Sequence, residues 1–250
     1  MTDSKAPQDA LSQHEAPQQV SLLPVTLEQA IASADLFELL AVAFAYPTER
    51  LLEGLSEGYV REDVLACFLE LHAPDHLIEH LQELFDGVEA SGDHLSFMSM
   101  KKEYTHLYMV LGEDTKLFPF EGTYLHVIEK QPVMPSMFQT QVTQDVEDWM
   151  RRCNALPATT DAEPVDSVYS EFNFMRKMFT NLAKALQLGD HDDAAAWWRE
   201  IVGFRAEHID KWIPLFMKHT LVVTNSAAYA GFARLALLAL IHIPGGQTEK

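Results

Sequence analysis

The sequence has few cysteines, and this scarcity excludes two kinds of protein. Only Cys67 and Cys153 occur among its 250 residues. They lie too far apart for a CxxC metal or redox motif and are too few for a disulfide scaffold. The first residues also lack the basic start and apolar run of a secretory signal. We therefore expect a protein of a reduced compartment, the cytoplasm.

Basic residues are scarce as well. There are 18 Lys and Arg against 37 Asp and Glu, which gives a formal net charge of −19. Such an excess of carboxylates repels phosphate backbones and anionic lipids, so neither nucleic acid nor a membrane surface is an expected partner. A basic peptide is the partner that this charge favours.

Long apolar runs are missing too. In the most apolar stretch, 221–243, the unbroken apolar run is only 235–241, which is far shorter than the roughly 20 residues that a membrane-spanning helix needs. We interpret the apolar stretch around it as a buried helix, and we expect no stable membrane insertion. Apolar residues make up 48% of the chain and charged residues 22%, which is ordinary globular composition and allows a sizeable core.

No convincing strand pattern is present, because the strong apolar periodicities lie near 3.6 residues. The sequence predicts an all-α protein, a single globular domain of about nine or ten helices. Thr26 and Gln29 form a capping box before the first helix, which should stop before Pro47. Further helical stripes are predicted within 51–55, 64–69, 77–88, 100–111, 138–153, 168–186, 190–212 and 225–241.

Several helix ends are predicted from single residues. Asp75 and Asp166 are predicted N-caps, because aspartate side chains commonly accept hydrogen bonds from the first turn of a helix. Gly189 is a predicted C-cap. Pro214 is expected to kink or end the helix that begins near Asp190.

Proline and small polar residues divide the chain into parts. Residues 1–23 are expected to form a disordered tail, 24–243 the helical domain and 244–250 a polar C-terminal tail. Proline-rich breaks near 113–135 and 154–165 are interpreted as hinge loops. They leave open a two-lobed arrangement, and with it a homodimer formed by exchange of lobes.

Catalytic motifs are also lacking. No phosphate-binding glycine loop and no nucleophile with a base and an orienting group can be assembled. His72, His76 and His80 have the spacing of metal ligands, but Pro74 interrupts them and acidic neighbours favour a solvated helix face. We therefore expect no enzyme, no bound metal and no cofactor. The alternative is a helical metal-dependent or nucleotide-dependent hydrolase that uses His76 and His80.

Three groups of polar and aromatic residues exceed what core packing requires. The first consists of Glu103, Tyr104, Leu107, Tyr108, Gly112, Phe118, Pro119, Phe120, Glu121, Gly122, Thr123 and Tyr124. The second consists of Glu163, Pro164, Val165, Asp166, Glu171, Phe172, Asn173, Phe174 and Met175. The third consists of Phe204, His208, Trp212, Pro214 and Phe216.

In order and spacing these groups resemble the TorD/DmsD/NarJ family of cytoplasmic chaperones that mature molybdoenzymes. The resemblance covers about residues 30–220 and departs from the family pattern at two positions. Ser167 stands where the family has a histidine after the Glu-Pro-x-Asp run, and Gly122 stands where a serine is common. The missing histidine suggests a subgroup with its own client enzyme.

The resemblance implies a chaperone that binds the apo form of a molybdopterin-dependent oxidoreductase, its twin-arginine leader, or both. It would assist cofactor insertion before export or assembly. The binding residues implied are Tyr104, Phe118, Pro119, Phe120, Glu121, Tyr124, Glu163, Pro164, Asp166, Glu171, His208 and Trp212.

These residues also have structural interpretations. For Glu121, Glu163 and Asp166 the alternative to peptide contact is helix capping or a local salt bridge. For Tyr104, Tyr124 and Trp212 the alternative is burial in the core, with the tyrosine hydroxyl or the indole N–H in a hydrogen bond. His208 is interpreted as a structural histidine near a helix end.

Overall fold

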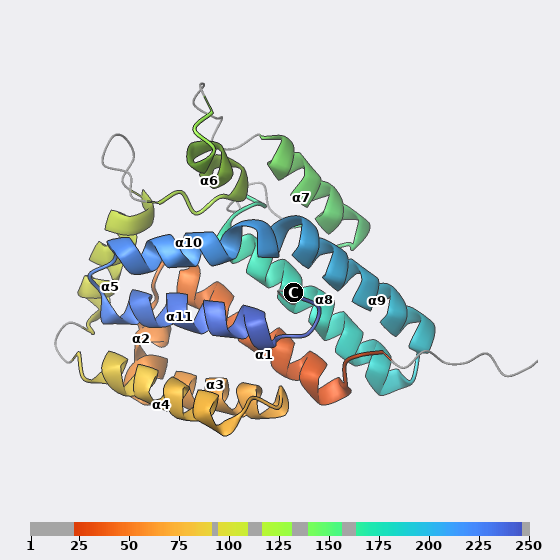
Figure 1. Ribbon diagram of the computed structural model, residues 1–250, viewed down its shortest axis with the longest axis horizontal. Coiled ribbons are helices and arrows are strands. Elements are labelled where there is room, and N and C mark those ends of the chain that lie inside the picture. The colour runs from red at the N-terminus through yellow and green to blue at the C-terminus, as the bar shows by residue number, and fades with distance from the viewer. Residues whose placement is uncertain (1–22, 92–94, 110–116, 132–139, 157–163, 247–250) are drawn as a thin grey trace, which may run out of the picture.

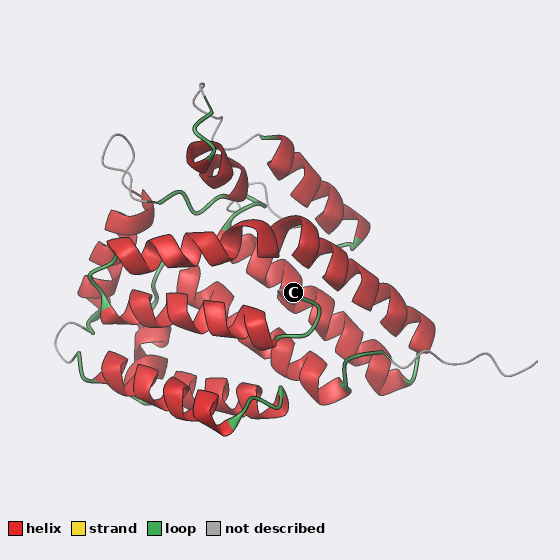
Figure 2. Ribbon diagram, in the orientation of Figure 1, coloured by secondary structure: helices red, strands yellow, loops and turns green. Residues whose placement is uncertain are grey.

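Helices are the only regular elements in the part of the chain that the structure describes, a computed structural model covering residues 23–91, 95–109, 117–131, 140–156 and 164–246 (Figure 2). The predicted all-α fold is therefore confirmed. The tails predicted at 1–23 and 244–250 lie almost wholly or in part outside these residues, so those assignments stay predictions. Most of the predicted hinge loop at 154–165 also lies outside them. The loop predicted near 113–135 is wrong in part, because its described residues 117–131 contain a helix, Glu121–Ile128.

Eleven α segments are described. They are α1 (Leu27–Phe44), α2 (Glu49–Ser56), α3 (Tyr59–Glu70), α4 (Asp75–Glu89), α5 (Phe97–Tyr104), α6 (Glu121–Ile128), α7 (Gln141–Arg152), α8 (Val168–Leu188), α9 (His191–Phe204), α10 (Asp210–Val223) and α11 (Ala227–His242). Two π turns, η2 (Thr105–Met109) and η3 (Arg205–Ile209), continue α5 and join α9 to α10. Because α9, η3 and α10 run on without a break, the described chain has ten continuous helices, as predicted.

The first helix begins and ends where the sequence predicts. The Thr26 side chain accepts a hydrogen bond from the Gln29 amide at 3.2 Å, and the Gln29 side chain accepts one from the Thr26 amide at 3.1 Å. This capping box satisfies two amides that the first turn leaves without helical partners. The helix ends at Phe44, three residues before Pro47.

Helices α1 and α8 pack along each other at the centre of the fold (Figure 1). Helices α10 and α11 lie side by side across them, α3 and α4 cover one side, and α6 and α7 lie at the opposite side (Figure 1). One continuous cluster of buried apolar side chains includes residues from every described α helix. The described residues thus form the single-domain arrangement rather than two lobes.

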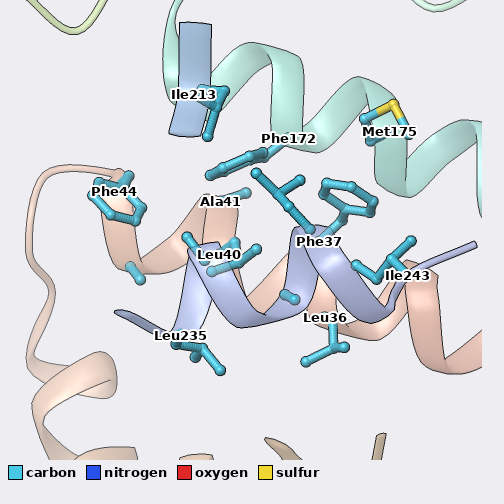
Figure 3. Close-up of a cluster of buried hydrophobic side chains, with 14 of the residues drawn as sticks. Leu36, Phe37, Leu40, Ala41, Phe44, Phe172, Met175, Ile213, Leu235 and Ile243 are labelled. Carbon is cyan, nitrogen blue, oxygen red and sulfur yellow. The ribbon is translucent and has the colours of Figure 1, made fainter. Parts of the chain in front are cut away.

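Aromatic contacts fill the seam between α1 and α8 (Figure 3). The ring of Phe37 lies 5.8 Å from the rings of both Phe172 and Phe179, and all three side chains are fully buried. Such pairs stabilise the fold beyond the apolar area that they remove from water.

Two predicted caps are wrong by one residue. Pro74 precedes the first residue of α4, so Asp75 lies inside the helix, where its charge still complements the helix dipole. Ser167 is the N-cap of α8, and its hydroxyl accepts a hydrogen bond from the Ser170 amide at 3.0 Å. Asp166 does not cap α8, because its carboxylate is used by α6 instead.

The prediction that Pro214 kinks or ends its helix also places the irregularity wrongly. The α9 helix changes to a π turn at Arg205–Ile209, and α10 then continues through Pro214 to Val223. Pro214 thus lies inside a continuous helix, where it supplies no amide donor, and the helix nevertheless continues for nine residues beyond it. The π turn directs the side chains of Arg205 and His208 into buried polar contacts, which explains why the distortion occurs there.

Arg205 fixes the end of α11. Its guanidinium is buried and donates hydrogen bonds to the carbonyl oxygens of Leu240 (2.7 Å) and Ile243 (2.8 Å) and to Asp210 (2.9 Å). The last carbonyls of a helix have no helical partner, and here a side chain from another helix supplies the donors.

No described helix is by itself long and apolar enough to cross a membrane. Helices α1 and α2 meet that criterion only when they are taken together, as a pair bent by 119°.

Candidate functional site

Backbone hydrogen bonds bring the first two sequence motifs together. The Glu121 amide donates to the Asp166 carbonyl at 2.8 Å, and the Val168 amide donates to the Pro119 carbonyl at 3.0 Å. Phe120 and Ser167 form an isolated antiparallel bridge between these two bonds. The start of α6 and the start of α8 are therefore fixed side by side.

The Asp166 side chain holds the start of α6 against α7. One carboxylate oxygen accepts hydrogen bonds from the Gly122 amide at 3.2 Å and from the Thr143 hydroxyl at 3.1 Å. Burial raises the pKa of Asp166, and these two hydrogen bonds oppose that rise. Asp166 is thus a positioning residue for α6 in this structure.

His208 of η3 joins the third motif to the first. Its Nδ1 lies 2.7 Å from Oε2 of Glu121, and both side chains are almost fully buried. Its Nε2 lies 3.3 Å from a carboxylate oxygen of Asp145, an exposed residue of α7. The imidazole therefore lies between two carboxylates, one inside the protein and one at its surface.

Glu171 lies next to Glu121 and completes the cluster. The indole of Trp212 donates a hydrogen bond to Oε2 of Glu171 at 2.9 Å. Burial, and then the negative charge of Glu121, raise the pKa of Glu171 well above its ordinary value. Both effects favour the neutral form of Glu171 over the ionised form.

Comparison with known families decides what kind of protein carries this cluster. Residues 72–218 match the family described as nitrate reductase delta subunit. The chain belongs to this family. It is a family of NarJ/TorD-type chaperones for molybdoenzyme maturation, so the resemblance seen in the sequence motifs is confirmed. No curated protein and no solved structure matched the chain.

In this member of the nitrate reductase delta subunit family, the buried polar cluster consists of five residues: Glu121, Asp166, Glu171, His208 and Trp212. All five lie within the matched segment, and all five side chains are buried. The structural interpretations of these residues therefore describe their contacts in the free chain. Their predicted role in binding a partner stays a prediction.

Ring contacts connect the aromatic residues Tyr104, Tyr124 and Trp212 predicted for the site. Tyr124 is buried against Trp212, with ring centroids 5.8 Å apart, and its hydroxyl lies 2.7 Å from Nδ1 of His219. Burial raises its pKa to about 12. Tyr104 is linked to Tyr124 through Tyr108 and Phe216. The ring centroids lie 5.1 Å apart for Tyr104 and Tyr108, 5.8 Å for Tyr108 and Phe216, and 5.4 Å for Phe216 and Tyr124.

The remaining predicted residues lie at the edge of the cluster or beyond the described chain. Pro119 is buried, whereas Phe118, Phe120 and Pro164 are half-buried. Glu163 lies outside the described residues.

Sequence reasoning missed several partners of the cluster. Thr143 and Asp145 lie on α7, which carries none of the three motifs, so nothing in the sequence indicated that they would contact Asp166 and His208. His219 was missed for a similar reason, although it follows the third motif on the same helix.

The histidines of the metal-site alternative lie at the surface of the described chain. His72 lies in the turn before α4 with a positive φ of 58°, while His76 and His80 lie exposed on α4. Among the described residues, no three His, Cys, Asp or Glu side chains are grouped so that they could hold a metal ion.

Proposed function

We propose that this chain is a cytoplasmic chaperone that binds the apo catalytic subunit of a molybdopterin-dependent oxidoreductase through the twin-arginine leader of that enzyme. It holds the client until the cofactor has been inserted, before export or assembly. The observation that carries this proposal is the family match over residues 72–218, which contains the whole buried cluster.

The charge of the chain supports a leader peptide as ligand. A net charge of −19 attracts a segment with two adjacent arginines, and guanidinium groups form strong paired hydrogen bonds with carboxylates. The apolar run that follows the arginines would pack on apolar side chains at the surface. Such a protein shields its client and catalyses nothing.

The buried cluster contributes indirectly. Glu121, Asp166 and His208 fix the start of α6, and with it the preceding Phe118 and Phe120, which are half-buried. In this proposal they hold in place a preformed surface for the body of the apo catalytic subunit, so that its binding costs little ordering of the chaperone.

Titration calorimetry with a leader peptide tests the proposal. The probe carries two adjacent arginines before an apolar run, and the control peptide has both arginines replaced by glutamine. We expect the first to bind more tightly and its affinity to fall, but not vanish, as salt rises, since only the charged part is screened.

The client is identified by mass spectrometry of the proteins that co-purify with the chain from its own cytoplasm. A molybdoenzyme catalytic subunit is expected among them. Equal affinity for the two peptides, together with no molybdoenzyme subunit in the purified material, would contradict the proposal.

A further inference from the structure

A groove of about 910 Å³ lies between α1, α2 and α3, outside the buried polar cluster. Its lining residues come from 35–67, with Tyr169 of α8 as the one exception among the described residues. The family match begins at residue 72, so the groove is built almost entirely from the part of the chain that the match leaves out.

Large apolar side chains are exposed along the groove. Val42 is 41% exposed, Tyr46 45% and Tyr59 58%, and Leu39 and Val60 lie beside them. Single exposed apolar residues are ordinary, but several around one hollow are typical of a surface that binds another apolar group.

Carboxylates surround these apolar side chains. Asp35, Glu38, Glu53 and Asp63 line the groove, and Arg50 is the one cation among its described lining residues. Glu38 has a distant ion pair with Arg176 at 3.8 Å. Burial, and then the negative charges of Glu38 and Asp63, raise the pKa of Asp35.

We propose that this groove is the docking site for a segment of the client that carries arginines next to large apolar side chains. The arginines would lie against Asp35, Glu38 and Asp63, and the apolar side chains would contact Val42 and Tyr59. The inference rests on the proposed function and adds the place where the segment binds.

The chemistry of the groove fits this occupant in three ways. Its volume lies at the upper end of the range of ligand pockets, which suits several side chains of a peptide. Its excess of carboxylates matches guanidinium groups rather than phosphates or acidic peptides. Tyr59 and Tyr169 add aromatic faces, on which a guanidinium stacks favourably, whereas the Tyr46 ring already has the Lys101 ammonium 5.4 Å from its centroid.

Fluorescence anisotropy with the full chain and a labelled arginine-containing leader peptide tests the apolar part. The double variant Val42→Ser/Tyr59→Ser is expected to raise the Kd at least tenfold. Its matched control, Met98→Ser/Val222→Ser, removes two side chains that are 71% and 81% exposed elsewhere, and should leave the Kd within twofold. Melting temperatures of all variants show whether the fold is intact.

The charged part is tested by Asp35→Asn/Asp63→Asn. We expect a Kd about fivefold higher at low salt and a smaller dependence of the Kd on salt. The control, Glu79→Gln/Glu83→Gln, makes the same change in net charge on the exposed face of α4 and should leave the Kd within twofold.

The outcomes separate this inference from the proposed function. If the wild-type chain binds the peptide and both groove variants bind it equally well, the groove is not the docking site, while the proposed function stands. If the wild-type chain does not bind the peptide, both the groove assignment and the leader-binding part of the proposed function are overturned.

Two other occupants would also overturn the inference. A peptide of residues 1–22 that displaces the labelled probe would assign the groove to this chain's own N-terminus. A dimer in sedimentation experiments that the Val42→Ser/Tyr59→Ser variant converts to a monomer would assign it to a second copy.

Discussion

The side chain of Thr140 fills the space beside Gly122 that a larger residue on α6 would need. A Cβ atom at position 122 would lie 3.0 Å from both Cβ and Cγ2 of Thr140. Thr140 cannot easily rotate away, because its hydroxyl caps α7 by accepting from the Thr143 amide at 3.0 Å. This contact leaves no room for a side chain at position 122 unless Thr140 moves.

The first prediction follows from this contact. Gly122→Ser should lower the free energy of unfolding by about 1–3 kcal/mol, as overpacking of a tight site does. Gly87→Ser is the control, because a Cβ at that helical glycine would meet nothing within 4 Å. Urea denaturation measures both. Adding Thr140→Gly to Gly122→Ser should cost less than the sum of the single changes, and strict additivity would refute the explanation.

The raised pKa of Glu171 predicts that the wild-type chain loses stability as the pH rises. The folded chain keeps the Glu171 proton at pH values at which the unfolded chain has lost it. Above the ordinary Glu pKa of about 4.3, the free energy of unfolding therefore falls by up to about 1.4 kcal/mol per pH unit from this group.

Glu171→Gln removes that titration while its side-chain oxygen can still accept from Trp212. We expect the variant to gain stability relative to the wild type from pH 5 to pH 7, as measured by urea denaturation at each pH. The exposed Glu83→Gln serves as the control and should give no such trend. A stability difference that does not change with pH would show that Glu171 is ionised in the folded chain.

Removal of Arg205 should release the end of α11. Arg205→Met leaves the buried carbonyls of Leu240 and Ile243 without donors and leaves Asp210 without this ion pair. We expect a loss of about 3–5 kcal/mol in the free energy of unfolding, the usual cost of breaking a buried pair. Arg199→Met, on the exposed face of α9, is the control. Equal stability of the two variants would contradict the anchoring role.

Both thiols should react slowly near neutral pH. Burial is the main cause that raises the pKa of Cys67 to about 12 and that of Cys153 to about 11, so little of either thiol is ionised at pH 7.5. Mass spectrometry after iodoacetamide treatment should show much slower labelling than for a free cysteine peptide. Labelling of either residue at the rate of the peptide would mean that it is exposed.

The sequence by itself determined the helical fold. Thr26 and Gln29 specified the first cap, and the apolar stripe from Val168 to Leu186 specified the central helix α8. Both signals are local, because helical hydrogen bonds join residues four apart and the stripe repeats with the helical turn. The three motifs likewise indicated the family, because their order and spacing run along the chain itself.

Caps and helix irregularities were less well determined. Asp166 and Ser167 are both good capping residues, and only the position of α6 decides that Asp166 serves Gly122 and leaves the α8 cap to Ser167. The π turn at Arg205–Ile209 has the same explanation, since its side chains have their partners on other helices.

Only the tertiary structure decided which polar side chains meet. Glu121 and His208 are 87 residues apart in sequence, and nothing in the sequence around either residue indicates that their side chains will meet. No sequence motif indicated that Asp145 would contact His208 or that a groove would form beside Val42. Local sequence fixes the helices because the relevant contacts lie within a turn, whereas these contacts exist only after packing of several helices has placed distant residues together.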